Sequence, residues 1–242
     1  MDYVYSLDMT VPASRCDAEG KLSVPAAFEL FMDLAAEHAA ALGMGLTDLR
    51  SRNLMWVSVR TRIRFDRRPA MGERVILSTW PEKPGSIRCC RDFTIAAGGE
   101  SAVAGRTEYA VIDLSSLRPQ PMGEIYSPEL AAALTEESVF SEPFRRISEK
   151  FRPEERLGEY TVRPSDIDMA GHMNNTMYPR MVLDFIPARE QAERPVREME
   201  LCYRSPCYEG DTLTLYRRKT EDGAEIAAFL PDGRTALLVK MK

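Results

Sequence analysis

Apolar residues recur every three or four positions between residues 24 and 42, and this spacing predicts an amphipathic helix of about five turns. Ser23 can cap the start of the helix, Pro25 suits its first turn and Gly43 can end it. Residues 57–65 then alternate between apolar and polar side chains, which is typical of a half-buried strand. Further strands are expected at residues 75–80, 87–95 and 102–114.

The second half of the chain follows the same order. A shorter helix is expected at residues 175–185, and strands are expected at residues 197–205, 211–219, 223–230 and 234–241. The triplets Glu221–Gly223 and Pro231–Gly233 are strong hairpin signals between the last three of these strands.

Two short motifs indicate an internal repeat. An Asp-x-x-Gly sequence precedes the helix of each half, at residues 17–20 and 168–171. Later in each half, an arginine and a proline come before a glycine, an acidic residue and a strand, at residues 67–75 and 204–213. Each half is therefore predicted to be a helix wrapped by antiparallel strands, in an α+β fold whose two halves share one continuous sheet.

Prolines and a loss of alternation mark the boundary between the halves. Residues 1–118 are expected to form an N-terminal domain and residues 156–242 a C-terminal domain. Residues 119–155 are expected to be a linker, with a short helix near residues 128–135.

The composition excludes several classes of protein. A net charge of −5 lacks the basic excess of a nucleic-acid-binding protein. No apolar run approaches the roughly 18 residues of a membrane span, and Met1–Tyr5 resembles no signal peptide, so a cytoplasmic protein is expected. Five cysteines, two of them adjacent, and only two histidines favour reduced thiols over a zinc site.

The densest polar cluster lies between residues 165 and 178, where a strand gives way to the second helix. Carboxylate and imidazole groups there could activate water, and free N–H groups at the helix start could stabilise an oxyanion. Asp, Asn and Gly are also ordinary turn and cap residues. The first half, however, manages its cap with Lys21, Leu22 and Ser23. The polar surplus of the second half therefore indicates one active copy and one scaffold copy.

The pattern Asp-x-Asp-x-x-Gly-His-x-Asn-Asn-x-x-Tyr at residues 166–178 resembles the signature of hotdog thioesterases, particularly the acyl-ACP thioesterases of plants and bacteria. The resemblance spans nearly the whole chain, because further motifs of that family occur in the same order at residues 36–38, 53–57, 67–69, 79–80 and 91–93. It implies a tandem (double) hotdog, with two long helices each wrapped by an antiparallel sheet. It also implies an N-terminal domain that serves as scaffold and acyl pocket, and a C-terminal domain that carries the catalytic loop.

The activity that the resemblance implies is hydrolysis of fatty acyl-ACP without a metal or organic cofactor. The expected partner is acyl carrier protein, with no nucleic acid and no membrane, and a homodimer is left open. Two alternatives remain: an acyl-CoA thioesterase and a non-catalytic acyl-binding protein.

The resemblance also assigns roles to single residues. Asp168 matches the catalytic aspartate and His172 the histidine of the family. The family's asparagine two residues after the aspartate is replaced by Ala170, so its role of orienting the water or the histidine is vacant or passes to Asn174 or Asn175.

Further on, plant members have a Glu-Cys pair that falls on Pro206 and Cys207, with Glu209 as a possible substitute for the glutamate. Ala170 and Pro206 stand where the family has polar residues, and these two replacements favour the non-catalytic acyl-binding alternative. The residues expected to bind substrate are Gly171, Met173, Trp56 and Met55.

Arg60, Arg62 and Arg64 alternate with apolar residues and are expected to emerge on one exposed face of a strand. Such a face could steer an acidic carrier protein. The alternatives are that this face packs against the C-terminal domain or is merely solvated. His38, on the apolar face of the first helix, is expected to be a satisfied core histidine.

Overall fold

The computed structural model describes residues 3–242, and the chain divides into two compact units between Pro143 and Phe144. The elements of the first unit are β1 (Tyr5–Thr10), α1 (Val24–Ala41), α2 (Leu46–Ser51), β2 (Leu54–Phe65), β3 (Arg74–Pro81), β4 (Cys89–Ala97), β5 (Glu100–Asp113) and α3 (Pro128–Ala133). Its strands pair antiparallel in the order β1-β3-β4-β5-β2.

The elements of the second unit are β6 (Arg156–Thr161), α4 (Met177–Asp184), α5 (Ala188–Glu193), β7 (Glu198–Tyr203), β8 (Thr212–Thr220), β9 (Gly223–Phe229) and β10 (Thr235–Met241). Its strands pair antiparallel in the order β6-β8-β9-β10-β7. With β6 as the counterpart of β1, both units have the same topology, and the predicted internal repeat is confirmed.

The helices and strands predicted from periodicity are present, and the predicted linker helix is α3. The strand β1 was not predicted, nor were α2 and α5, and β6 was expected only as a strand without bounds before the polar cluster. Both strands lie at an end of the strand order of their unit, and none of their residues is buried. An edge strand with few buried side chains lacks the apolar alternation from which strands are predicted.

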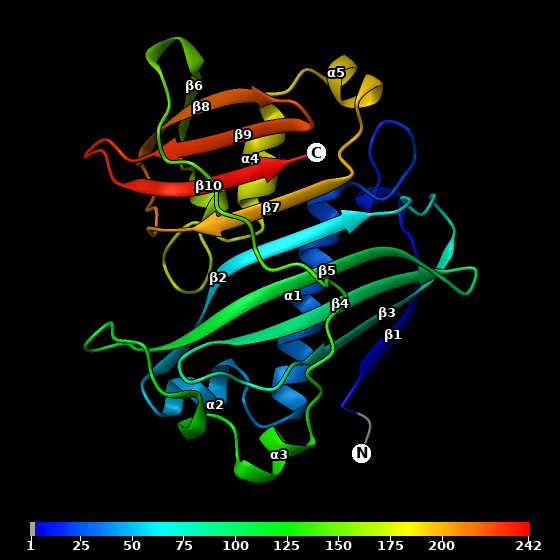
Figure 1. The fold of residues 1–242 in the computed structure, drawn as a ribbon, viewed down its shortest axis with the longest axis vertical. Coiled ribbons are helices and arrows are strands. Elements are labelled where there is room, and N and C mark those ends of the chain that lie inside the picture. The colour runs from blue at the N-terminus through cyan, green and yellow to red at the C-terminus, as the bar shows by residue number, and fades with distance from the viewer. Residues whose placement is uncertain (1–2) are drawn as a thin grey trace. The chain divides into compact units, whose positions relative to one another are not determined.

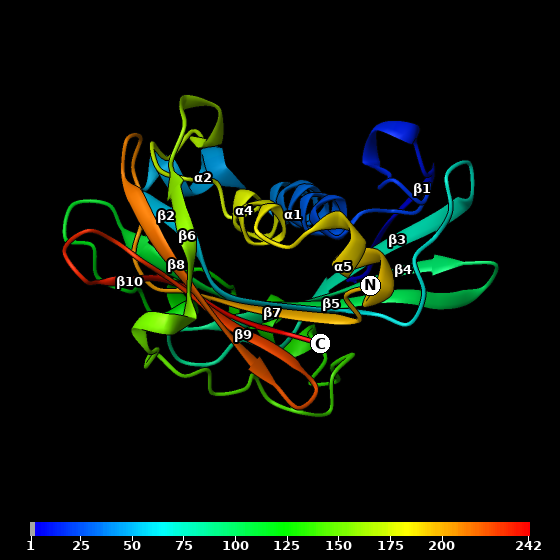
Figure 2. The ribbon, with the colours of Figure 1, turned by 90° about the horizontal axis from the view of Figure 1, so that it is seen from above.

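Helix α1 begins as its sequence predicts, because the Ser23 Oγ accepts a hydrogen bond from the Ala26 N–H at 3.2 Å. The helix crosses one face of the sheet of its own unit (Figures 1 and 2). The Phe31 ring stacks on Phe93 with ring centroids 4.8 Å apart and lies directly over Gly105, which has no side chain to obstruct it. None of the helices described between residues 3 and 242 is long and apolar enough to cross a membrane.

Helix α4 is much shorter than α1, with eight residues against 18. Only the first of the two helices is therefore long. The shortening has a local cause: Pro187 begins the next helix, and a residue that precedes proline is disfavoured in the helical region.

The expectation of an exposed arginine face on β2 is wrong. Arg62 is only 4% exposed, and its guanidinium lies 4.3 Å from the centre of the Phe140 ring and 3.5 Å from the Glu142 carboxylate. Arg64 also lies over Phe140, at 5.3 Å, and Arg60 is half-buried. The segment that follows α3 covers this face, so Arg60, Arg62 and Arg64 do not form an open docking surface for an acidic carrier.

The alternation of β2 is also interrupted, because its pairing with β5 shifts register between Ser58 and Arg60. Thr61, Ile63 and Phe65 form the buried face after the shift. A bulge of this kind moves the residues before it onto the opposite face relative to a regular strand. Strict alternation predicted that Val57 and Ile63 share a face of the strand. The register shift places them on opposite faces instead.

A buried carboxyl group ties the same covering segment to the sheet. Asp92 is fully buried, and its oxygens accept hydrogen bonds from the Ser138 hydroxyl at 3.2 Å and the Val139 N–H at 3.3 Å. Burial, followed by the nearby Glu82 carboxylate, raises the pKa of Asp92. Glu82 itself is paired with Arg106 at 2.6 Å.

Gly105→Ala should destabilise the first unit. A Cβ there would overlap the Phe31 ring, and overpacking typically lowers the free energy of unfolding by about 1–3 kcal/mol. Urea unfolding measures the change. Gly123→Ala is the matched control, because its Cβ would meet nothing within 4 Å. Equal stabilities of the two variants would contradict the close approach of α1 to the sheet.

Asp92→Asn should weaken the pH dependence of stability. The raised pKa means that the folded protein holds this proton more tightly than the unfolded chain does. The resulting stability is present below about pH 4 and is lost as the pH rises through the raised pKa. An asparagine cannot ionise, so stability should fall less between about pH 5 and about pH 8 in the variant than in the wild type. Ser138→Ala, which keeps the carboxyl group, should retain the wild-type trend, and parallel profiles for wild type and Asp92→Asn would contradict the assignment.

Candidate active site

The polar cluster forms a tight hairpin between β6 and α4. Ile167 and Met173 face each other as a bridge, the Asp168 N–H donates to the His172 carbonyl at 3.0 Å, and the Gly171 N–H donates to the Asp168 carbonyl at 3.0 Å. Gly171 has a φ of 80°, which a residue with a side chain adopts only with strain. Residues opposed across such a ribbon direct their side chains to one face, so Asp168 and His172 emerge together.

The two acids of the signature have different surroundings. Asp166 is 3% exposed, and its carboxylate accepts hydrogen bonds from the Tyr160 hydroxyl at 2.6 Å and the Arg163 N–H at 2.8 Å. Its carbonyl accepts from the Asn174 N–H at 2.8 Å. Burial, followed by the hydrogen bond to Asp166, raises the pKa of Tyr160. Asp166 therefore anchors the loop, whereas Asp168 is half-buried at its open side.

The two asparagines also differ. The Asn174 Oδ1 accepts from the Thr176 N–H at 2.9 Å and the Thr176 hydroxyl at 3.0 Å, which fixes the chain as it enters α4. The Asn175 side chain makes no hydrogen bond with any other residue between 3 and 242, and its carbonyl accepts from the Tyr203 hydroxyl at 3.4 Å. Of the two candidates for the orienting role, Asn175 is the one whose side-chain oxygen and nitrogen both lack a partner among residues 3–242, since the Asn174 oxygen is bound to Thr176.

Cys207 lies beneath the loop rather than at its surface. It is fully buried, its carbonyl accepts from the Met173 N–H at 2.8 Å, and its thiol faces the Ser205 carbonyl at 3.8 Å. Burial raises the pKa of this thiol. Tyr178, which the sequence analysis quoted without giving it a role, packs edge-on against Tyr203 with ring centroids 5.6 Å apart. Glu209 is exposed in the turn before β8 and makes no ion pair with the rest of the described chain.

Trp56 and Met55 lie on β2 in the first unit. The Trp56 Nε1 donates to the Met44 carbonyl at 2.9 Å, and its ring packs edge-on against Tyr109 and Tyr126. Met55 is half-buried. Their role in binding an acyl chain stays a prediction. His38, expected to be a satisfied core residue, is 5% exposed and its Nδ1 is 2.9 Å from the Arg91 guanidinium.

The loop before α1 has the same backbone hydrogen bonds as the loop before α4. In the first unit they run from Asp17 N to Lys21 O, from Gly20 N to Asp17 O, from Leu22 N to Pro69 O and from Ser23 N to Arg15 O. In the second they run from Asp168 N to His172 O, from Gly171 N to Asp168 O, from Met173 N to Cys207 O and from Asn174 N to Asp166 O. Asp17 is therefore the counterpart of Asp168, and Lys21 that of His172.

These hydrogen bonds also give the register of the second repeat motif, for which the sequence predicted only the order of residues. They pair Pro69 with Cys207, so Arg68 is the counterpart of Pro206. The glycines at 72 and 210 agree with this register, since their N–H groups donate to the carbonyls of Val11 and Val162.

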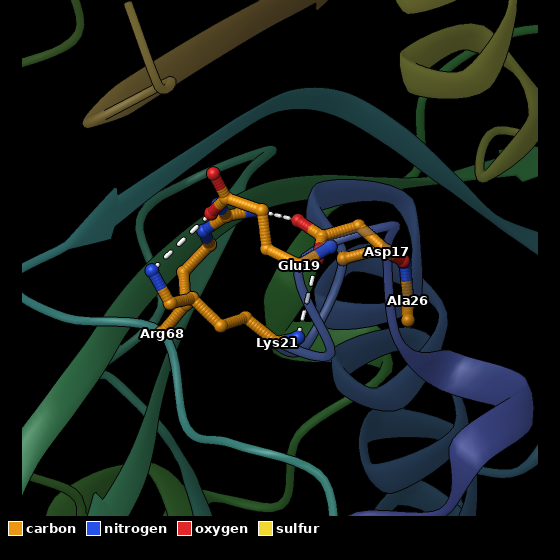
Figure 3. Close-up of polar contacts among 6 residues, drawn as sticks. Asp17, Glu19, Lys21, Ala26 and Arg68 are labelled. Carbon is orange, nitrogen blue, oxygen red and sulfur yellow. Dashed lines mark hydrogen bonds and ion pairs between the residues drawn. The ribbon is translucent and has the colours of Figure 1, made fainter. Parts of the chain in front are cut away.

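The two loops share backbone hydrogen bonds, but their side chains differ in how many polar contacts they make. The Asp17 carboxylate accepts from the N–H groups of Glu19 at 2.9 Å and Lys21 at 3.1 Å, and it forms an ion pair with Arg68, whose guanidinium also reaches Glu19 at 3.2 Å. Figure 3 shows these groups gathered at the loop. The first loop is therefore closed by its own polar contacts.

In the second loop, the Asp168 Oδ1 accepts a single hydrogen bond, from the Ala170 N–H at 2.8 Å. Its Oδ2 has no hydrogen-bond or ion-pair partner among residues 3–242, and the His172 N–H has no acceptor there either. The N–H groups of Gly171, Met173 and Asn174 are all used within the unit. Among the N–H groups of residues 171–174, only that of His172 is left to face a ligand.

The site can accept a proton and bind an oxyanion. An ionised carboxylate oxygen without a partner can take a proton from water. The His172 Nδ1 lies 3.4 Å from the Met173 carbonyl, and a nitrogen facing a carbonyl carries the proton, which leaves Nε2 as an acceptor in the neutral ring. Within residues 3–242, no three His, Cys, Asp or Glu side chains are grouped so that they could hold a metal ion.

Residues 2–129 match the family described as acyl-ACP thioesterase N-terminal domain, and residues 149–230 match its C-terminal domain. The chain is 26% identical over 199 residues to oleoyl-acyl carrier protein thioesterase 1, chloroplastic, of Arabidopsis thaliana, which covers 76% of this chain and 55% of that protein. The chain therefore spans about half the length of the curated plant relatives that it matches.

Solved structures show the same fold. An acyl-ACP thioesterase from Bacteroides thetaiotaomicron superposes with a TM-score of 0.89 at 23% identity, over 99% of this chain and 97% of that one. The 12:0-ACP thioesterase from Umbellularia californica superposes with a TM-score of 0.84 at 18% identity, over 100% of this chain and 97% of that one. The predicted double hotdog class is thereby confirmed. With both of its domains matched in order, the chain belongs to the acyl-ACP thioesterase family.

Proposed function

We propose that this chain hydrolyses the thioester bond between a fatty acyl group and acyl carrier protein, with Asp168 as the central catalytic residue. One observation carries the proposal: the Asp168 Oδ2 lacks a partner, whereas the equivalent Asp17 is neutralised by Arg68. Such a difference between two otherwise matching loops is expected if only one of them performs chemistry. The substrate class is supported by the acyl carrier protein thioesterases that the chain resembles.

The geometry supports a simple reaction path. A water molecule held at the Asp168 Oδ2 loses its proton to the carboxylate as its oxygen attacks the thioester carbonyl. The backbone N–H of His172 faces the carbonyl oxygen of the thioester as that oxygen gains negative charge, and the Asn175 side-chain amide orients the reactants. The carbon–sulfur bond then breaks, the carrier leaves as a thiolate that takes up a proton, and the fatty acid is released. Direct attack by Asp168 on the carbonyl uses the same open oxygen.

Two other functions compete with this one. An acyl-CoA thioesterase would use the same loop and differ only in the contacts with the carrier. A non-catalytic acyl-binding protein would have no need of an unpaired carboxylate, and this disfavours it. Steady-state hydrolysis of acyl-ACP and acyl-CoA with the same acyl chain separates the three, because only an acyl-ACP thioesterase turns over the first substrate with the higher kcat/KM.

Asp168→Asn should lower kcat for acyl-ACP by at least about a hundredfold, the usual lower scale for the loss of a catalytic acid or base. Asp17→Asn is the matched control, since it makes the same change at the equivalent position of the closed loop and should leave kcat within about twofold. Comparable rates for both variants in folded protein would remove Asp168 from the mechanism.

Cys207→Ala should keep substantial activity. A cysteine nucleophile requires a thiolate, and burial raises the pKa of this thiol instead of lowering it. Mass spectrometry of the wild type during turnover should find no acyl group on Cys207. A trapped acyl-cysteine, or complete loss of activity in folded Cys207→Ala, would show that the thiol takes part.

A further inference from the structure

Residue 206 holds a position from which it can control Asp168. A backbone hydrogen bond 2.8 Å long attaches each loop to the rest of its unit: the Leu22 N–H donates to the Pro69 carbonyl, and the Met173 N–H donates to the Cys207 carbonyl. Arg68 and Pro206 are the residues directly before these two carbonyls. Because the two loops share this attachment, Pro206 holds in the second unit the backbone position that Arg68 holds beside Asp17 in the first.

Arg68 shows what a cation does in this position. Its side chain is only 13% exposed, and it pairs with the Asp17 carboxylate and with Glu19 at 3.2 Å (Figure 3). A guanidinium held there occupies the carboxylate oxygen and the space beside it. A substrate cannot reach the oxygen that is paired in this way.

Pro206 supplies none of these contacts. It is exposed, it carries no charge and it has no N–H group to offer to the carboxylate. Asp168 has no ion pair within the described chain, and the His172 N–H stays open where the Lys21 N–H is bound to Asp17. The exchange of arginine for proline thus accompanies the change from a closed to an open loop.

We infer that the residue at position 68 or 206 decides whether the aspartate of the loop is available for chemistry, so that Arg68 silences the first loop and Pro206 keeps the second one active. The effect on activity rests on the proposed function of Asp168. The formation of the ion pair depends only on the geometry of the loop. The two parts are therefore separable by experiment.

Pro206→Arg rebuilds the closed arrangement in the active unit, and Pro206→Gln is its matched control, with a long polar side chain but no charge. Pro206→Arg should reduce kcat/KM for acyl-ACP at least about tenfold more than Pro206→Gln does, because its cation pairs with Asp168. The acidic limb of its pH–rate profile should move to lower pH, because a nearby cation lowers the pKa of a carboxyl group. Added salt should restore part of the activity, since a half-exposed ion pair is screened.

Thermal unfolding detects the ion pair without any activity measurement. The melting temperature of Pro206→Arg should exceed that of Pro206→Gln, and combining each variant with Asp168→Asn should abolish the difference. Arg68→Gln, made with and without Asp17→Asn, applies the same cycle to the first loop. This second cycle tests the pair even if the position 206 variants fold poorly.

The outcomes distinguish the inference from the proposed function. If melting shows no coupling between residues 206 and 168, or between 68 and 17, the inference is overturned while the role of Asp168 stands. If coupling is present but Pro206→Arg hydrolyses acyl-ACP as fast as Pro206→Gln, Asp168 is not the catalytic group. Coupling together with selective loss of activity, a shifted acidic limb and rescue by salt supports both.

Discussion

The attachment of each polar loop to a carbonyl beside the sheet is the constraint on which the rest of the site depends. The Met173 N–H reaches the Cys207 carbonyl, and the Asp166 carbonyl receives the Asn174 N–H, so both ends of the loop are fixed by backbone groups. Buried backbone groups must be paired, and here that requirement also sets the direction of the side chains between them. Asp168 and His172 oppose each other across this hairpin, so their side chains emerge on one face.

The chain builds this frame twice and uses it in two ways. A backbone frame specifies where a side chain starts, but the chemistry depends on which neighbours meet that side chain. In the first loop, the Arg68 guanidinium and two N–H groups occupy the Asp17 carboxylate. In the second, a single N–H holds one oxygen of Asp168 and leaves the other accessible. Folded proteins retain strained or unpaired groups mainly where function requires them. The first loop, whose aspartate is paired, is the reference against which the unpaired oxygen of Asp168 in the second loop is judged.

Much of the fold could be predicted from the sequence, because the relevant signals are local. The cap at Ser23, the apolar spacing of α1 and the hairpin glycines each act over a few residues, and each is found where expected. The burial of Arg62 could not be predicted in the same way. Alternation shows that a side chain lies on one face of a strand, but it carries no information about a distant segment, here Phe140 and Glu142, that covers that face. The edge strand β1 was missed for a related reason, since none of its residues is buried.

The site was predictable as a region but not in its division of labour. Residue type alone grouped Asp166, Asp168, Asn174 and Asn175 together, and only the family resemblance singled out Asp168. The structure shows what each already binds: Asp166 Oδ2 and Asn174 Oδ1 hold the loop and the helix start, whereas Asp168 accepts a single N–H and the Asn175 side chain has no hydrogen-bond partner among residues 3–242. Polar groups that satisfy the backbone are structural by necessity, because leaving those N–H groups unpaired would cost about 1–3 kcal/mol each. What distinguishes Asp168 is the comparison with the first loop, because its counterpart Asp17 is paired with Arg68 whereas Asp168 has no ion pair among residues 3–242.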